Sequence, residues 1–192
     1  MKIGLFFGSF NPVHIGHLII AEYMLEHADL EEVWFVVSPQ NPFKMNQDLM
    51  PETDRIEMVR MAIEDNRRLS ATDIEFGLPK PSYSITTMKE IDKLNPDDEF
   101  AIIMGYDNLE GLHKWEGYQS LLAKHKIFAY YREGYTTGLF GDHPQVKLFK
   151  APVLNISATF IRECLVNGRS VRYLVTPEVE KYLYELFAKN PA

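Results

Sequence analysis

The sequence is short of the residues that build disulfides and membrane spans. Cys164 is the only cysteine among 192 residues, so neither an internal disulfide nor a cysteine metal cluster can form. No apolar run approaches the ~20 residues of a membrane-spanning helix, and the run at residues 3–7 is too short for a secretory signal. We therefore expect a cytoplasmic protein with no membrane partner.

Positive charge is also scarce. The chain has 20 Lys and Arg against 27 Asp and Glu, which gives a net charge of −7. This balance disfavours a nucleic-acid partner, because a nucleic-acid binder needs a basic face. An acidic protein that binds anionic nucleotides must gather its few cations and backbone amides in one pocket.

Two common nucleotide-binding motifs are missing as well. Neither G-x-G-x-x-G nor G-x-x-x-x-G-K-[ST] occurs. Their absence disfavours both a dinucleotide-dependent Rossmann oxidoreductase and a P-loop NTPase.

What the chain does contain is an alternation of apolar strands and amphipathic helices. Short apolar runs predict strands at residues 3–7, 33–37, 100–104 and 127–131, and less distinct segments predict a short strand at 70–76 and a weaker one at 146–149. Helical periodicity predicts helices at about 14–25, 52–65, 84–94, 158–166 and 177–188. This alternation is typical of an α/β fold with a doubly wound, mostly parallel, Rossmann-like sheet. We expect a single domain over residues 1–192, with the C-terminal helical part, about 157–189, packed on it.

In such a sheet, ligands bind beyond the carboxyl ends of the strands, so the loop after the first strand is the first place to look for a site. It reads Gly-Ser-Phe-Asn-Pro-Val-His-Ile-Gly-His over residues 8–17. Gly8 and Ser9 allow a phosphate to approach the backbone, and His14 and His17 project from one face of the first helical turn. The unpaired N–H groups and the positive dipole end of that turn favour an anion.

Two alternative roles for this motif are a metal site and a helix cap. A His-x-x-His pair can ligate a metal, but no third ligand stands at a suitable spacing. An ordinary capping arrangement would not require Gly-Ser, Asn-Pro and two histidines to share one turn. We favour a phosphate site.

A second motif, Asn-Ile-Ser-Ala-Thr-Phe-Ile-Arg, lies at residues 155–162. Ser157 is a good N-cap for a helix that carries Arg162 one turn further along. Hydroxyls, a helix N-terminus and one cation suit the β- and γ-phosphates of a nucleotide. By itself the pattern is weak, because Ser-x-Thr before a helix is most often only a cap.

Together the two motifs resemble the nucleotidyltransferase superfamily and, more closely, the bacterial nicotinate-nucleotide adenylyltransferases. The segments Pro-Ser-Tyr-Ser-Ile-Thr-Thr-Met at 81–88 and Ile-Met-Gly-Tyr-Asp at 103–107, with Trp115, extend the resemblance over essentially the whole chain. It implies that AMP is transferred from ATP to nicotinate mononucleotide, which gives nicotinate adenine dinucleotide and pyrophosphate in NAD biosynthesis. It also implies Mg²⁺ carried by the ATP phosphates.

The resemblance implies roles for individual residues. The catalytic residues would be His14, His17 and Arg162. The ATP-binding residues would be Gly8, Ser9, Phe10, His14, His17, Met104, Gly105, Asp107, Ile156, Ser157, Thr159 and Arg162. The mononucleotide-binding residues would be Asn41, Lys44, Tyr83, Ser84, Thr86 and Trp115. No side chain is expected to ligate a metal.

Several other residues are expected to have no catalytic part. His113, His125 and His143 are expected at the surface, and Cys164 is expected to pack within its helix.

Three alternatives stay open from the sequence. His-Ile-Gly-His is also a signature of class I aminoacyl-tRNA synthetases, but this chain lacks a Lys-Met-Ser-Lys-Ser loop and an RNA-binding domain. Phosphopantetheine adenylyltransferase or another small-molecule nucleotidyltransferase is a nearer alternative, and a nucleotide-sensing module is the non-enzymatic one. The sequence leaves the oligomeric state open, a homo-oligomer included.

Overall fold

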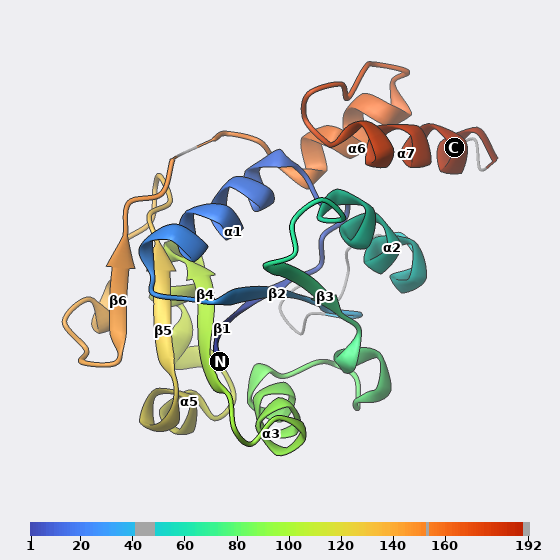
Figure 1. The fold of residues 1–192 in the computed structure, drawn as a ribbon. Helices are drawn as coiled ribbons and strands as arrows, with labels where there is room; N and C mark the ends of the chain where they lie inside the picture. The colour runs from blue at the N-terminus through green and yellow to red at the C-terminus, as the bar shows by residue number, and fades with distance from the viewer. Residues whose placement is uncertain (41–48, 153, 190–192) are drawn as a thin grey trace.

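A six-stranded sheet forms the centre of the molecule. The computed structural model describes residues 1–40, 49–152 and 154–189. The strands are β1 (Lys2–Gly8), β2 (Glu32–Val37), β3 (Leu69–Thr72), β4 (Glu99–Gly105), β5 (Lys126–Tyr130) and β6 (Val146–Phe149). Their order is β3-β2-β1-β4-β5-β6, and each neighbouring pair is parallel (Figure 1). The chain therefore winds outward from β1 in both directions, as the sequence predicts.

Helices cover both faces of this sheet (Figure 1). One face carries α1 (Ile15–His27), α2 (Glu52–Ala62), α6 (Ala158–Val166) and α7 (Pro177–Lys189). The other carries α3 (Ser84–Leu94), α4 (Tyr106–Glu110) and α5 (Tyr118–Lys124). Short 3₁₀ turns, η2 (Ile74–Gly77), η3 (Leu112–Lys114) and η4 (Gly138–Phe140), complete the connections.

The sheet separates two hydrophobic cores. In β1 the side chain of Phe6 joins the core under α1 and α2, whereas Ile3 and Leu5 join the core under α3 and α5. In β4, Ile103 and Ile102 divide in the same way, because successive side chains of a strand point to opposite faces. Burial on both faces explains why the strands read as continuous apolar runs rather than as alternating ones.

Two parts of the fold differ from the sequence prediction. The strand predicted over 70–76 is wrong beyond Thr72, where β3 ends and η2 follows. There the Ile74 N–H bonds to Thr72 Oγ1 at 3.3 Å, so a local side-chain bond takes a donor that a longer strand would need. The short helices α4 and α5 were not predicted, because a helix of so few residues shows little periodicity.

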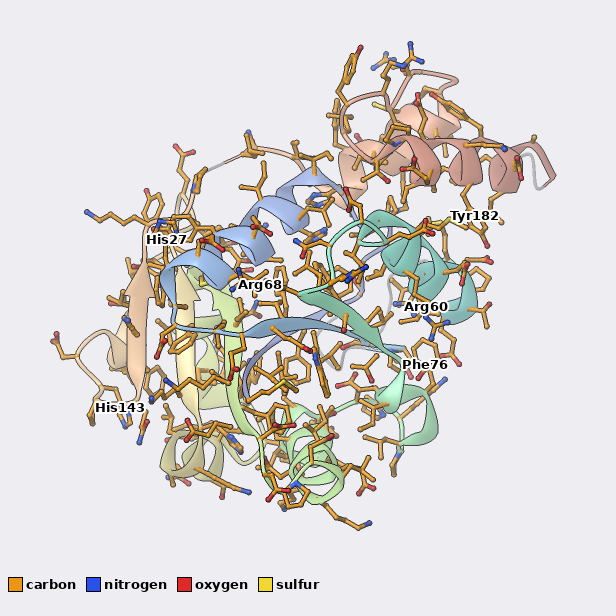
Figure 2. All side chains as sticks on the ribbon, viewed as in Figure 1. His27, Arg60, Arg68, Phe76, His143 and Tyr182 are labelled. Atoms are coloured by element: carbon orange, nitrogen blue, oxygen red, sulfur yellow. The ribbon has the colours of Figure 1, made fainter. Side chains whose placement is uncertain are left out.

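The C-terminal helices α6 and α7 lie together at one end of the molecule, next to α2 (Figure 1). Tyr182 of α7, labelled in Figure 2, donates from its hydroxyl to Asp54 Oδ1 of α2 at 2.8 Å. On α6, Arg162 Nη1 donates to the carbonyl of Asn11 at 2.7 Å. Both C-terminal helices are therefore bonded to the sheet-forming part of the chain.

The order of the strands also sets the position of a cleft. β1 pairs with β2 on one side and with β4 on the other. The chain leaves β1 toward α1 on one face and leaves β4 toward α4 on the other face, so the loops diverge beyond these two carboxyl ends. Within the described residues, no helix has the length and apolar character needed to cross a membrane.

Candidate active site

The loop after β1 turns back on itself at Phe10. This residue has a φ of 44°, in the left-handed region, and its ring is only 2 % exposed. The ring packs against Phe6 and Phe35, with centroids 5.7 and 5.2 Å away. A Cβ on Gly8 would lie 2.8 Å from the Cζ of that ring, so glycine at this position makes room for Phe10 as well as for a ligand.

The two histidines of the motif stack at the start of α1. His14 is the N-cap residue and has an extended backbone, while His17 lies in the first turn. Their ring centroids are 3.7 Å apart, and a Cβ on Gly16 would lie 3.1 Å from the His14 ring. The backbone N–H of His14 donates to His17 Nδ1 at 3.2 Å. A neutral His17 ring therefore carries its proton on Nε2.

Burial makes His14 a neutral residue. Loss of solvent lowers its pKa to about 4, and the positive charge of Arg132 acts in the same direction. The Nδ1 atom of His14 is buried and has no hydrogen-bond partner among the described residues. His14 therefore brings no net charge to this loop. The two histidines also form a capping box at the start of α1, so the capping role considered from the sequence is present in the structure.

The second motif meets the first one in space. Ser157 caps α6 as the sequence predicts, since its Oγ accepts the Phe160 N–H at 3.1 Å. Arg162 bonds to the Asn11 carbonyl and, through Nη2, to Thr159 Oγ1 at 3.4 Å. Its guanidinium thus sits next to the loop that carries the histidines.

A second cation, which the sequence analysis missed, enters from the loop after β5. Arg132 Nη1 lies 2.8 Å from Asp107 Oδ2, and both residues line the same cavity. The other carboxylate oxygen, Asp107 Oδ1, is buried and unbonded within the described parts of the chain. Arg132 follows a predicted strand by only a few residues, which is the same signal that indicated Asp107, so it could have been found.

These groups surround a cavity of about 350 Å³, which we call the histidine cavity. A volume of this size is within the usual range for a small-molecule site. Of the predicted ATP-binding residues, those that line it are Gly8, Ser9, Phe10, His14, His17, Asp107, Ile156, Ser157, Thr159 and Arg162.

The other two predicted ATP-binding residues do not line the histidine cavity. Met104 is 3 % exposed and belongs to the core under α3 and α5, so the structure does not bring it together with the others. Gly105 lies at the end of β4, where a Cβ would collide with Asp107 Oδ1. Its lack of a side chain therefore lets the Asp107 carboxylate turn back over the strand end.

A smaller cavity of about 70 Å³, the tryptophan cavity, lies on the other side of the β1 end. It is lined by Phe7, Gly8, Ser38, Glu75, Ser82, Tyr83, Ser84, Asn108, Trp115 and Glu116. Phe7, Gly8 and Asn108 also line the histidine cavity, so the two are halves of one cleft.

The tryptophan cavity brings together half of the predicted mononucleotide-binding residues, namely Tyr83, Ser84 and Trp115. Thr86 lies in the first turn of α3 and is not among the lining residues. Asn41 and Lys44 fall outside the described residues.

Arg55 of α2 ties the loops of this cleft together from behind. It is 1 % exposed, and its Nη1 donates to the carbonyls of Ser9 at 2.6 Å and Ser38 at 2.7 Å. Its Nη2 and Nε donate to the carbonyls of Pro39 at 3.2 Å and Met50 at 3.0 Å. This residue was not predicted from the sequence, although an arginine beside the apolar stripe of α2 is the kind of signal that reveals a buried cation.

The remaining histidines were predicted at the surface, and for His125 this was wrong. It is 5 % exposed, with Nδ1 3.3 Å from the carbonyl oxygen of Phe100 and Nε2 3.3 Å from Asp92 Oδ2. Burial lowers its pKa, although Asp92 opposes this effect. The error has the same origin as the missed α5, whose C-terminal end buries this ring.

The other minor predictions concern His113, His143 and Cys164. His113 is exposed and Cys164 is buried in α6, as predicted. His143 is partly exposed and lies just before β6 (Figure 2). Over the described residues, no three His, Cys, Asp or Glu side chains form a group that could hold a metal ion.

Comparison with known proteins gives the family. The cytidylyltransferase-like family model matches residues 5–164. A protein of Cytophaga hutchinsonii named "Probable nicotinate-nucleotide adenylyltransferase" is 49 % identical over 183 residues, which cover 95 % of each chain. A protein of the same name from Flavobacterium psychrophilum is 45 % identical and covers 95 % of this chain and 96 % of its own. This chain belongs to the nicotinate-nucleotide adenylyltransferase family.

Solved structures agree with the fold of that family. The nicotinic acid mononucleotide adenylyltransferase of Plasmodium falciparum, in complex with NaAD, superimposes with a TM-score of 0.83 over all of this chain and 98 % of its own. At 16 % identity this likeness concerns the fold alone. Family membership and fold together confirm the sequence prediction of a nucleotidyltransferase with a Rossmann-like sheet.

Proposed function

We propose that this chain transfers AMP from ATP to nicotinate mononucleotide, releasing pyrophosphate and forming nicotinate adenine dinucleotide in the cytoplasm. One observation carries the proposal. The histidine cavity, with its imidazoles and arginines, meets the tryptophan cavity at the carboxyl end of β1. A polyphosphate bound in the first cavity and a pyridine mononucleotide bound in the second would place their reacting phosphates side by side above Gly8.

On the ATP side, the phosphates lie against the start of α1. His17 contacts the α-phosphate, His14 contacts the polyphosphate, and Arg162 contacts the departing pyrophosphate. Arg132 adds a second positive charge in the same cavity, which suits a protein of net charge −7 that must concentrate its cations. The unbonded Asp107 Oδ1 accepts a hydroxyl of the ribose.

The reaction needs no general base. A phosphate monoester has its second pKa near ~6, so the attacking mononucleotide is mostly a dianion at neutral pH. It attacks the α-phosphorus in line with the leaving pyrophosphate. The protein therefore has to align the two substrates and neutralise the charge that builds up in the transition state.

We expect Mg²⁺ to enter on the ATP phosphates. Asp107 is the one carboxylate among the described residues that line the histidine cavity, and it is paired with Arg132. Such a donor set fits an ion that keeps its waters and phosphate oxygens rather than one held in a protein cage. When bound, the ion would neutralise phosphate charge.

On the acceptor side, the pyridine ring stacks on Trp115. The helix α3 begins at Ser84, which lines the tryptophan cavity, and the positive end of its dipole favours an anionic group there. Tyr83, Ser84 and Thr86 are proposed to hold the nicotinate part. Asn41 and Lys44 are proposed to reach the 5′-phosphate of the mononucleotide.

Pyrophosphate release with a panel of acceptors tests this proposal. We expect transfer to nicotinate mononucleotide, transfer to its amide with a kcat/KM roughly tenfold to a hundredfold lower, and none to phosphopantetheine. Trp115→Ala should weaken both mononucleotides and leave the KM for ATP nearly unchanged. A preference for phosphopantetheine, or turnover of ATP without any acceptor, would overturn the assignment.

A further inference from the structure

The tryptophan cavity has in its wall a buried carboxyl group that takes no part in the proposed transfer of AMP. Glu75 lies on η2, is 1 % exposed, and lines the cavity. One of its oxygens, Oε1, accepts a hydrogen bond from Thr87 Oγ1 at 2.7 Å. The other, Oε2, is buried and has no hydrogen-bond partner among the described residues.

A second unbonded polar atom lies in the same wall. Ser82 is 8 % exposed, and its Oγ also has no partner within the described part of the chain. Leaving a buried polar atom without a partner typically costs about 1–3 kcal/mol. The Ser38 and Ser82 hydroxyls lie close enough to Glu75 to lower the pKa of its carboxyl group, so this wall can also satisfy itself. Because the same groups line the cavity, a polar group of a ligand can take up these hydrogen bonds when it binds.

The proposed function identifies that polar group, and the inference rests on it. If the pyridine ring stacks on Trp115, which lines the same cavity as Glu75, the ring substituent is the polar group that the cavity wall must accommodate. In nicotinate mononucleotide this substituent is a carboxylate. In the amide it is a carboxamide of nearly the same shape.

Charge decides how a carboxylate can be accepted beside Glu75. None of the described residues that line the tryptophan cavity is a cation, and its other titratable side chains are Tyr83 and Glu116. Burial raises the pKa of Glu75, while the hydroxyls of Thr87, Ser38 and Ser82 lower it. A carboxylate in contact with Glu75 would raise the pKa of one of the two groups, and a proton held between them would remove the repulsion.

We propose that Glu75 recognises the ring carboxylate of the acceptor by sharing one proton with it. In the free enzyme this proton is on Glu75 or is taken up from solvent as the acceptor binds. The carboxamide needs no such proton, because it can donate to an ionised Glu75 or accept from a neutral one. Preference for the acid therefore depends on pH, and preference for the amide increases as Glu75 ionises.

The ratio of kcat/KM for the acid to kcat/KM for the amide, measured between about pH 6 and pH 9, tests the inference. The titration of the 5′-phosphate and of groups in the histidine cavity is common to both acceptors and cancels in this ratio. The wild-type ratio should fall by up to about tenfold per pH unit above the pKa of Glu75 in the free enzyme. Glu75→Gln keeps an acceptor for Thr87 and offers an N–H that does not titrate. For this variant the ratio of kcat/KM values should therefore favour the acid and should not change with pH.

Two controls make the result specific. Glu116→Gln removes an exposed carboxylate from the same cavity and should leave the slope of the wild-type ratio unchanged. Calorimetry of the wild type in two buffers of different ionisation enthalpy should show more proton uptake when the acid binds above that pKa than when the amide binds. This measurement needs no variant and stands even if a substitution impairs folding.

The outcomes separate the inference from the function on which it rests. A level wild-type ratio, an unchanged slope in Glu75→Gln, or equal proton uptake with both acceptors would overturn the role of Glu75 and leave the transferase assignment intact. Failure of the wild type to adenylylate either mononucleotide would instead overturn the proposed function itself.

Discussion

His14 and His17 are the same kind of side chain, yet their surroundings give them different properties. His14 has lost most of its solvent and is neutral, with a pKa of about 4. His17 Nδ1 accepts a hydrogen bond from the backbone N–H of His14, so the ring N–H of His17 is on Nε2, at the opposite edge of the ring. This difference is why His17, rather than His14, is the residue that we propose to contact the α-phosphate.

We expect His17→Ala to lower kcat by at least about a hundredfold, since removing one preorganised donor costs about 3–4 kcal/mol of transition-state stabilisation. The fold should persist. His27→Ala is the matched control, because His27 lies at the far end of the same helix and is exposed (Figure 2). Steady-state rates and circular dichroism of both variants show whether His17 contributes to catalysis or to folding. Near-normal turnover of His17→Ala would mean that His17 has no part in the mechanism.

The residues that the sequence did predict lie close together in a motif, and the ones it missed do not. Both histidines, Ser157 and Arg162 come from two short segments whose residue types are unusual in sequence. Arg55 and Glu75 acquire their importance only through burial, which brings them next to loops far away in the chain. Met104 shows the opposite error, because a strand end includes side chains that point into the core as well as residues that face the ligand.

At the scale of elements, α2 is joined to the cleft by a buried cation that bonds only to carbonyl oxygens in the described residues. Arg55 fixes the Ser9 carbonyl, and in a trans peptide the N–H of the next residue, Phe10, points the opposite way. The same guanidinium holds Ser38 after β2. It therefore sets the spacing between the loop of the histidine cavity and a wall of the tryptophan cavity.

Arg55→Lys should lower kcat by about tenfold or more, because a lysine cannot bond four carbonyls and the Ser9–Phe10 peptide loses its anchor. Met58→Ala is the control, since Met58 is buried in the same helix and its loss costs about 2–5 kcal/mol of stability without freeing a loop. Both variants should melt at lower temperature. At temperatures well below both melting temperatures, only Arg55→Lys should have a lowered kcat. If Arg55→Lys and Met58→Ala have equal kcat values, Arg55 has a purely structural role.

Elements were predictable where they are long or fully buried. The 11 residues of α3 carry an apolar stripe, and its predicted bounds agree with the structure. The five residues of α4 and the seven of α5 are too short for a period of 3.6 to stand out. The error at β3 came from reading apolar composition without the local hydrogen bond at Thr72 that ends the strand.

At the scale of the molecule, the C-terminal helices complete the cleft, and their attachment can be weakened separately from the chemistry. Tyr182 is the clearest point of attachment, because its hydroxyl bonds to Asp54 of α2. Burial, together with that carboxylate, raises the pKa of Tyr182 to about 12, so the phenol stays protonated and keeps donating at neutral pH.

Tyr182→Phe should lower the free energy of unfolding by about 1 kcal/mol and the melting temperature by about 2–4 °C. It should leave kcat unchanged, since Tyr182 lines neither cavity. Tyr173→Phe is the control, because that ring is 84 % exposed and should change neither quantity. Thermal unfolding and steady-state rates measure both effects, and equal stability of the two variants would show that the bond to Asp54 contributes nothing.

The overall architecture was only partly predictable. Alternating strands and helices predicted a doubly wound parallel sheet, because parallel strands require helical crossovers. Nothing in the local pattern gave the strand order, which depends on contacts between distant segments. The structure supplies this order, whereas the loop after the first strand was predictable as part of the site because ligands bind beyond the carboxyl ends of parallel strands.

The central place of β1 also has a consequence for synthesis on the ribosome. β1 emerges early, but one of its two neighbours, β4, begins only at Glu99, and Arg162 follows later still. At the usual speed of translation, the apolar strand that will support the catalytic loop waits several seconds with one edge open. An open strand edge can pair with other chains, so we expect this interval to be the one in which the nascent chain is most prone to aggregate. A nascent chain that stalls before α6 could complete the sheet and still lack Arg162, so the enzyme gains its full site only near the end of its own translation.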